Sequence, residues 1–317
     1  MIHRLLAVSL LVALPGLAAA QAYPSKSIRL VIPFGPGSAT DMIGRYVTER
    51  AGRILGTSFI VDNRPGANGM LAARELLKSP TDGYTIMMSS NSAHASNVYL
   101  YKDLNYDPVK DFAPITGMTV NPHVMVIRSS IPAQNLKEFI AYAKANPGKL
   151  NFGAGNTGGL ANASLFMSTA GFTATEVTYK SPPAAVIDLL GGRIDFMSVD
   201  YFIVADHFRA GTLRPLGVTS QARLKALPNV PPIADTLAGY ELNGWTASFA
   251  AAGTPPEVIA RLNKAFTTVL ASPEVDEYFE RQGMQTFITT PEALGAFVKE
   301  QVGKWAEVLS KAGVQRQ

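Results

Sequence analysis

One pattern constrains the fold of this 317-residue chain more than any other: a short apolar run stops at a turn, and helical spacing follows. Residues 28–47 show it first, in the sequence IRLVIPFGPGSATDMIGRYV. The apolar residues at 28–32 predict a buried strand, and the prolines and glycines at 33–37 end it. Thr40 and Asp41 are residue types that cap the predicted helix. The turn either only connects the two elements or binds an anion, because a helix N-terminus at a strand end attracts carboxylate or phosphate.

The same unit follows twice more in the first third of the chain. Residues 58–62 predict a strand, 63–69 a loop and 70–78 a helix. Residues 84–88 predict a third strand, which ends in the polar loop 89–94. Parallel strands joined by helical crossovers bring such loops to one edge of the sheet, so we expect the three loops to be neighbours.

The middle of the chain repeats the scheme. A predicted strand at 150–154 enters the glycine-rich loop 155–159, and a helix is expected over 161–170. A further strand at 193–199 ends at Asp200, just before a predicted helix over 201–209. This second set of units predicts a second α/β lobe.

The chain is expected to cross between the lobes near residues 119–123 and to return through an apolar strand at 245–251. The predicted division is therefore 23–121 plus 245–317 for lobe 1, and 122–244 for lobe 2. Two α/β lobes joined by two or more crossings describe a hinged molecule that holds a ligand in the cleft between them.

Residues 1–22 are predicted to be a signal peptide. His3 and Arg4 precede an apolar stretch at 5–17, and an A-x-A cleavage site follows at 18–20 or 20–22. The apolar stretch is shorter than the ~20 residues that span a bilayer. We therefore expect an exported, periplasmic protein.

The amino-acid composition excludes several kinds of site and partner. The chain has no cysteine, which excludes disulfides, zinc–thiolate sites and iron–sulfur clusters. Its 28 Lys and Arg residues outnumber 24 Asp and Glu only slightly and are scattered, so we expect no nucleic-acid partner.

A GxGxxG match at Gly153, Gly155 and Gly158 raises the alternative of a dinucleotide site. In a Rossmann unit the acidic residue ends the second strand, whereas here Glu176 begins its strand and Lys180 ends it. No GK[ST] follows the glycines, which excludes a P-loop. We favour an anion-binding helix N-terminus over a nucleotide site and expect no cofactor.

The sequence offers little for catalysis. Neither GxSxG nor HExxH occurs, and after the predicted signal only His94, His123 and His207 are available. A triad of His94 with a serine at 89, 90 or 92 stays open, but a hydrogen bond from His94 to the ligand or to a loop carbonyl is favoured. Structural roles are favoured for His123 and His207. We therefore predict no catalytic residue and no metal site.

Charged residues at the strand ends have two interpretations. Asp41 and Asp200 each stand where a strand gives way to a helix, so helix capping is favoured and orientation of the ligand loops is the alternative. Lys180 is a cation at a strand end that could neutralise an acidic ligand. Three strand-end aromatic residues either line the cleft or belong to the core: Phe34, Tyr201 and Phe202.

A resemblance to a known family rests on motifs along nearly the whole mature chain. They are YPSK with IRLVIPFGPGSATD at 23–41, VDNRPGANG at 61–69, DGYTIMM at 82–88, YDPVKDFAPI at 106–115, NPGKLNFGAGNTGG at 146–159, DLLGGRIDFM at 188–197 and AAGTPPEVIARLN at 251–263. In combination they resemble the Bug-type extracytoplasmic solute receptors of tripartite tricarboxylate transporters. The resemblance implies a type II periplasmic-binding-protein fold and capture of a small carboxylate for a membrane permease.

The resemblance also implies which loops hold a ligand carboxylate, namely residues 34–41 and 155–159. Together with the strand-end residues, the predicted ligand-binding set is Phe34, Gly35, Gly37, Ser38, Ala39, Thr40, Asp41, Ser90, Asn91, His94, Gly155, Asn156, Thr157, Gly158, Gly159, Lys180, Asp200, Tyr201 and Phe202.

The chain departs from the family pattern in two places. Residues 181–183 read SPP where the family often has glycine after its lysine, and residues 198–202 read SVDYF where many members have an Asp-Asn pair. The aromatic pair suggests an apolar or aromatic body on the acid. We expect a monomeric receptor that closes around a mono- or dicarboxylate and delivers it to a permease; the alternatives are a sensor that presents its ligand to a membrane kinase, and a secreted hydrolase.

Overall fold

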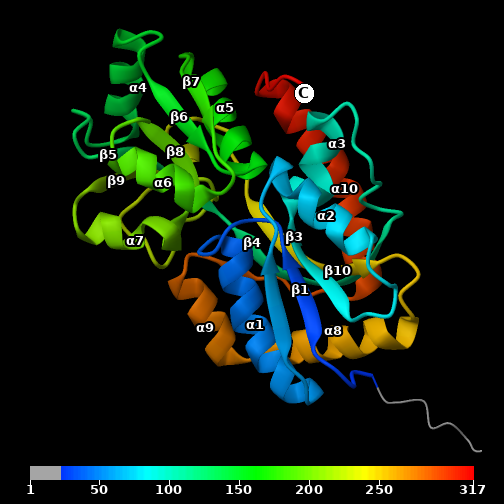
Figure 1. The fold of residues 1–317 in the computed structure, drawn as a ribbon. Coiled ribbons are helices and arrows are strands. Elements are labelled where there is room, and N and C mark those ends of the chain that lie inside the picture. The colour runs from blue at the N-terminus through cyan, green and yellow to red at the C-terminus, as the bar shows by residue number, and fades with distance from the viewer. Residues whose placement is uncertain (1–22) are drawn as a thin grey trace, which may run out of the picture.

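The computed structural model describes residues 23–317, so the predicted signal peptide lies outside the described residues. The chain forms two sheets, each covered by helices on both faces (Figure 1). The six-stranded sheet with its helices is lobe 1, and the five-stranded sheet with its helices is lobe 2. This arrangement confirms the predicted two-lobed α/β class.

Lobe 1 has the strand order β11-β4-β10-β3-β1-β2. Its strands are β1 (Ile28–Ile32), β2 (Phe59–Asn63), β3 (Thr85–Ser90), β4 (Phe112–Asn121), β10 (Gly244–Ala251) and β11 (Gln285–Thr286). Its helices are α1 (Ala39–Leu55), α2 (Met70–Leu77), α3 (Asn97–Leu100), α8 (Pro256–Leu270), α9 (Pro273–Arg281) and α10 (Pro291–Lys311). A short 3-10 turn at Ala67–Gly69 precedes α2.

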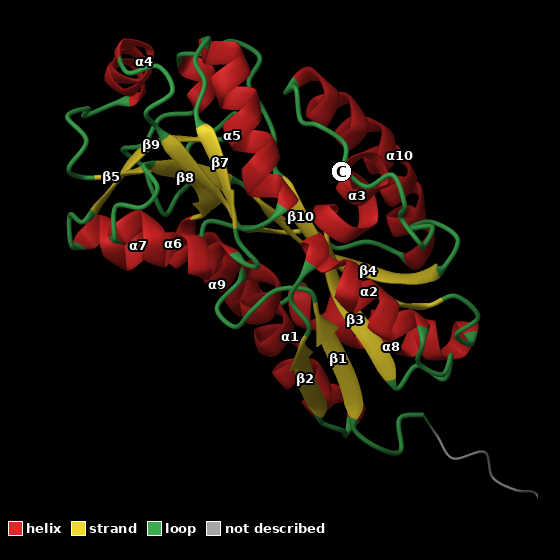
Figure 2. Cartoon of the chain, turned by 45° about the horizontal axis from the view of Figure 1, so that its top comes forward, coloured by secondary structure: helices red, strands yellow, loops and turns green. Residues whose placement is uncertain are grey.

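Lobe 2 has the strand order β7-β6-β8-β5-β9. Its strands are β5 (His123–Arg128), β6 (Asn151–Ala154), β7 (Thr175–Thr178), β8 (Phe196–Asp200) and β9 (Leu213–Val218). Its helices are α4 (Leu136–Ala145), α5 (Thr157–Ala170), α6 (Pro182–Leu190) and α7 (Tyr201–Arg209). Helices α4 and α5 cover one face of the sheet, and α6 and α7 cover the other (Figure 2).

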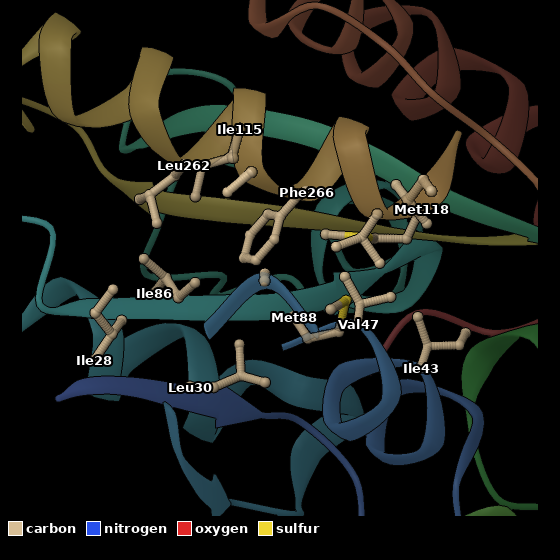
Figure 3. Packing of buried hydrophobic residues seen from close by; sticks show 14 of the residues in the cluster. Ile28, Leu30, Ile43, Val47, Ile86, Met88, Ile115, Met118, Leu262 and Phe266 are labelled. Atoms are coloured by element: carbon tan, nitrogen blue, oxygen red, sulfur yellow. The ribbon is translucent and has the colours of Figure 1, made fainter. Parts of the chain in front are cut away.

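The core of lobe 1 explains why its first unit folds as it does. Ile28, Leu30 and Ile32 are fully buried in β1, and α1 turns Ile43 and Val47 toward them. Figure 3 shows Ile28, Leu30, Ile43 and Val47 meeting residues of β3, β4 and α8 in one packed layer. Apolar residues four positions apart lie on one helical face, so the sequence spacing dictates which side of α1 is buried.

The chain crosses between the lobes twice. β4 of lobe 1 runs through Pro122 directly into β5 of lobe 2, and the segment after β9 returns to β10. The central strand β10 pairs antiparallel with both β3 and β4, so the returning chain closes the lobe 1 sheet. A search of residues 23–317 finds no helix that is both long and apolar enough to cross a membrane.

The loops after β1 and β2 lie side by side, as the parallel pairing of these strands requires. The Asn63 amide Nδ2 donates to the carbonyl oxygen of Phe34 at 2.9 Å. The third predicted loop, at 89–94, is different: β3 continues to Ser90, and a π-helix covers Ser92–Ser96. Several of its buried polar groups pair locally, as in the 3.1 Å hydrogen bond from the Ser96 hydroxyl to the carbonyl oxygen of Asn91, but Asn91 Nδ2 has no partner among the described residues.

Candidate functional site

The N-terminus of α1 forms one side of the site. Thr40 and Asp41 were expected as caps, but the helix begins earlier. Its N-cap is Ser38, whose Oγ accepts from the Asp41 backbone N–H at 3.4 Å. Asp41 is the third residue of the helix, and its carboxylate accepts from the Gly37 backbone N–H at 3.0 Å. Ser38 thus caps the first turn and Asp41 holds the residue before the cap, while the N–H groups of Ala39 and Thr40 are left without an acceptor in the helix.

The Asp41 carboxylate fixes the loop after β1 through further hydrogen bonds. Its Oδ1 accepts from Arg45 Nε and from Asn63 Nδ2, each at 2.9 Å. The carboxylate is therefore fully engaged within lobe 1 and ties the loop after β1 to the end of β2. Asp41 therefore orients the loop after β1 and is not the N-cap of α1.

The N-terminus of α5 forms the opposite side. The helix was expected from residue 161 but begins at Thr157, so the glycine-rich segment is its first turn rather than a loop. Asn156 is the N-cap, and its Oδ1 accepts from the Gly159 backbone N–H at 2.7 Å. The N–H groups of Thr157 and Gly158 are thereby left free of acceptors within the helix.

Two glycines allow the lobe 2 segments to approach closely. A Cβ on Gly155 would lie 2.4 Å from the backbone nitrogen of Pro182, so the loop before α5 touches the start of α6. A Cβ on Gly158 would lie 3.2 Å from Cε1 of His123. Across the lobes, a Cβ on Gly35 would lie 3.2 Å from the hydroxyl of Ser181. The glycines of the motif thus serve close packing at the lobe boundary.

A cavity between the lobes collects these elements. It encloses about 20 Å³ and is lined by Phe34, Ser38, Ala39, Thr40, Ser90, Asn91, Asn121, His123, Asn156, Pro182, Asp200, Gly244, Trp245 and Thr246. A single water needs ~10–15 Å³ of such space, so an acid of several carbons can enter only when the lobes separate.

Eight residues of the predicted set line this cavity: Phe34, Ser38, Ala39, Thr40, Ser90, Asn91, Asn156 and Asp200. The prediction missed six others: Asn121, His123, Pro182, Gly244, Trp245 and Thr246. Five of the six lie where β4, β5 and β10 cross between the lobes. A ligand between two lobes must touch the crossing strands, so the predicted crossings near 119–123 and 245–251 were the signal that could have revealed them.

His123 and Asp200 face each other at the lobe 2 edge of the cavity. The antiparallel register of β5 and β8 pairs them, and His123 Nε2 lies 3.8 Å from Asp200 Oδ1. His123 Nδ1 lies 3.2 Å from the Ser198 hydroxyl. Burial lowers the pKa of His123 and raises the pKa of Asp200, and each opposes the other's shift through their mutual attraction. The sequence favoured a structural role for His123, whereas the structure also places His123 in the cavity wall.

Other predicted residues are held outside the cavity. The Gly35 and Gly37 positions face Ser181 and Pro183 across the lobe boundary, and Lys180 is exposed. Tyr201 packs against Gly283 of lobe 1, and Phe202 packs against the lobe 1 core. These two aromatic residues therefore join the lobes, and the suggestion of an aromatic ligand loses its basis. The cavity lining also lacks Asp41, Gly155, Thr157, Gly158 and Gly159, which adjoin the lining residues Thr40 and Asn156 in the first turns of α1 and α5.

His94 points into the core of lobe 1 instead of the cavity. It is fully buried, it stacks on Phe249 at a centroid distance of 3.8 Å, and its Nδ1 lies 2.7 Å from the Ser89 hydroxyl. Burial lowers the pKa of His94 to about 3. A serine and a histidine are thus in contact, but both are sealed from solvent and from the cavity.

This burial predicts a pH-dependent stability. The unfolded chain binds a proton at His94 below pH ~6.5 and the folded chain does not, so the free energy of unfolding falls as pH falls from ~6.5 toward 3. The slope attributable to His94 is ~1.4 kcal/mol per pH unit. Urea unfolding at pH 6, 5 and 4 should show that His94→Gln removes about this much of the slope; equal slopes in both proteins would contradict the account.

Comparisons with known proteins agree with this geometry. A profile of the family named TctC, tripartite tricarboxylate transporter family receptor, matches residues 43–314. The chain belongs to the TctC family. It is 33% identical to protein BugT of Bordetella pertussis over 322 residues, which covers 98% of each chain.

Solved structures of TctC-type receptors superpose on the chain. Rhodopseudomonas palustris Rpa4515 with adipate shares 30% identity at a TM-score of 0.91, covering 93% of this chain and all of that one. MatC (Rpa3494) from the same organism, with bound malate, shares 27% identity at a TM-score of 0.84, covering 90% of this chain and all of that one. The chain therefore has the periplasmic-binding-protein fold and is a solute-binding receptor, not an enzyme; the hydrolase alternative is wrong.

Proposed function

We propose that this TctC receptor captures a small carboxylate between its lobes in the periplasm and delivers it to the permease of a tripartite tricarboxylate transporter. One observation carries the proposal: the N-termini of α1 and α5, one from each lobe, meet at the same cavity. Ser38 and Asn156 satisfy one donor in each helix, so the remaining first-turn N–H groups are available to a ligand.

A carboxylate suits this arrangement for two reasons. Each helix N-terminus carries the equivalent of roughly half a positive charge, so two of them balance one negative charge. The ligand also contacts both lobes at once, so it stabilises the closed arrangement selectively and shifts the lobe equilibrium toward closure. Adipate and malate, named with two of the structural neighbours, are both carboxylates.

The moving parts under this proposal are 23–121 with 245–317 as one body and 122–244 as the other. Residues 1–22 serve as the export signal. N-terminal sequencing of the protein recovered from the periplasm tests the export step: it should begin just after residue 20 or 22, and a start at residue 1 contradicts it.

A thermal-shift screen of acids against their matched amides tests ligand capture. A ligand that binds only the folded state raises the free energy of unfolding by ~2.7 kcal/mol at 100 times its dissociation constant. At least one acid should raise the melting temperature while its amide does not. Equal shifts by acids and amides would show that the helix N-termini do not select a carboxylate.

A further inference from the structure

Asp200 occupies an N-cap position without capping its helix. It precedes α7, yet its side chain makes no capping hydrogen bond, contrary to the favoured sequence interpretation. Its carboxylate is 5% exposed and lies in the cavity wall beside His123. Apart from its own backbone N–H, no group within residues 23–317 donates a hydrogen bond of ordinary length to it; the nearest charged partner is His123 Nε2 at 3.8 Å. A buried carboxylate with so little protein support points to a partner that the cavity receives.

The surrounding polar groups are also incompletely paired. Asn91 and Asn121 line the cavity and are 5% and 4% exposed, and neither Asn91 Nδ2 nor Asn121 Oδ1 has a hydrogen-bond partner among the described residues. Buried amide groups are normally paired, so both are available to a ligand. Asn121 Oδ1 adds a second acceptor to the carboxylate of Asp200, and Asn91 Nδ2 adds a donor.

The groups that form the cavity wall differ in charge: the helix N-termini are partly positive, and Asp200 carries a carboxylate. No lysine or arginine belongs to the described cavity lining, and Lys180 is exposed outside it. The helix N-termini attract one carboxylate, whereas Asp200 repels a second one. Burial raises the pKa of Asp200, and His123 and the backbone N–H of Asp200 itself offset that rise only in part. A ligand that places a cationic group at the Asp200 end of the cavity would compensate the charge of this carboxylate.

We propose that the ligand is an amino carboxylic acid whose carboxylate binds the N-termini of α1 and α5 and whose ammonium group binds Asp200. An ammonium group has three donors, which can serve both Asp200 and Asn121, whereas a hydroxyl group has one donor and leaves the buried charge uncompensated. This inference rests on the proposed carboxylate capture and adds the second half of the ligand.

Calorimetry with matched acids tests the inference. The probes are the standard amino acids, together with lactate and propionate as analogues of alanine, and malate and succinate as analogues of aspartate. At least one amino acid should bind, and in a matched set the amino member should bind most tightly. Asp200→Asn should weaken amino-acid binding by about 30-fold or more, because it removes one partner of a buried charge pair.

Asp206→Asn is the matched control, since Asp206 lies on the same helix, is exposed, and pairs with Arg209 away from the cavity; its binding should equal that of the native protein. Circular dichroism and the melting temperature establish whether Asp200→Asn is folded. If the variant binds amino acids more weakly but binds an analogue as tightly as the native protein or more tightly, the loss is an effect on the site and not unfolding.

Three outcomes overturn the inference. They are an amino-acid affinity that Asp200→Asn leaves unchanged, analogues that bind as tightly as the amino members, and no binding of any amino acid. In each case binding of malate, succinate, lactate or propionate would leave the proposed carboxylate capture standing. Failure of every acid to bind would remove both.

Discussion

Replacing Asn156 by aspartate is expected to weaken acid binding by about 100-fold while leaving the fold intact. The new side chain has the same shape and can still accept the hydrogen bond from the Gly159 backbone N–H. Aspartate is as good an N-cap as asparagine, so the melting temperature should stay the same or rise slightly. The added negative charge, however, faces the position where the ligand carboxylate binds, and like charges in a water-poor cleft repel strongly.

The same substitution at another helix provides the control. Asn135 caps α4, its Oδ1 accepts from the Glu138 backbone N–H at 3.0 Å, and it is exposed and remote from the cavity. Asn135→Asp should leave the dissociation constant unchanged in calorimetry. Native affinity in Asn156→Asp, or an equal loss in both variants, would refute a specific carboxylate site at the start of α5.

Replacing Gly155 by alanine is expected to lower the free energy of unfolding by about 2–3 kcal/mol and to weaken ligand binding. The new Cβ would lie 2.4 Å and 2.5 Å from the backbone nitrogen and Cα of Pro182. Backbone at the start of a helix cannot move aside like the end of a flexible side chain, so the loop before α5 must shift. That shift displaces Asn156 and Pro182, both of which line the cavity.

Gly303 is the matched control for this loss. It lies in α10, is exposed, and has no atom within 4 Å of the position a Cβ would take. Gly303→Ala should therefore raise stability by ~0.5–1 kcal/mol, since alanine favours the helix more than glycine does. Chemical denaturation of both variants measures the contrast; a Gly155→Ala protein as stable as the native one would mean that the close contact with α6 does not constrain the site.

Local patterns predicted much of the fold. The repeated strand, turn and helix gave the two α/β lobes, and the loops after β1 and β2 meet as parallel pairing requires. The start of α5 was misplaced because glycines at 158 and 159 have low helix propensity, which tertiary packing against β8 overrides. The polar segment at 89–94 was assigned to a loop for a similar reason, since its buried pairing partners cannot be read from composition.

The candidate site was only partly predictable because its decisive contacts join distant residues. His123 and Asp200 meet through the register of β5 and β8, which no local pattern specifies. Asp200 has the sequence signature of a helix cap, yet its side chain turns to the cavity instead. His94 followed a strand end like the true lining residues Ser90 and Asn91, but the π-helix turns it into the core.

The central claim is that the acid is held jointly by both lobes, so that binding and closure are one event. The chain has no native cysteine, so Ala141→Cys on α4 and Lys264→Cys on α8 place one label on the exposed surface of each lobe. We would measure the inter-label distance by energy transfer while titrating the acid that raises the melting temperature. The account predicts a change of distance that follows the calorimetric binding curve and is lost in Asn156→Asp; saturated binding with no change of distance would contradict it.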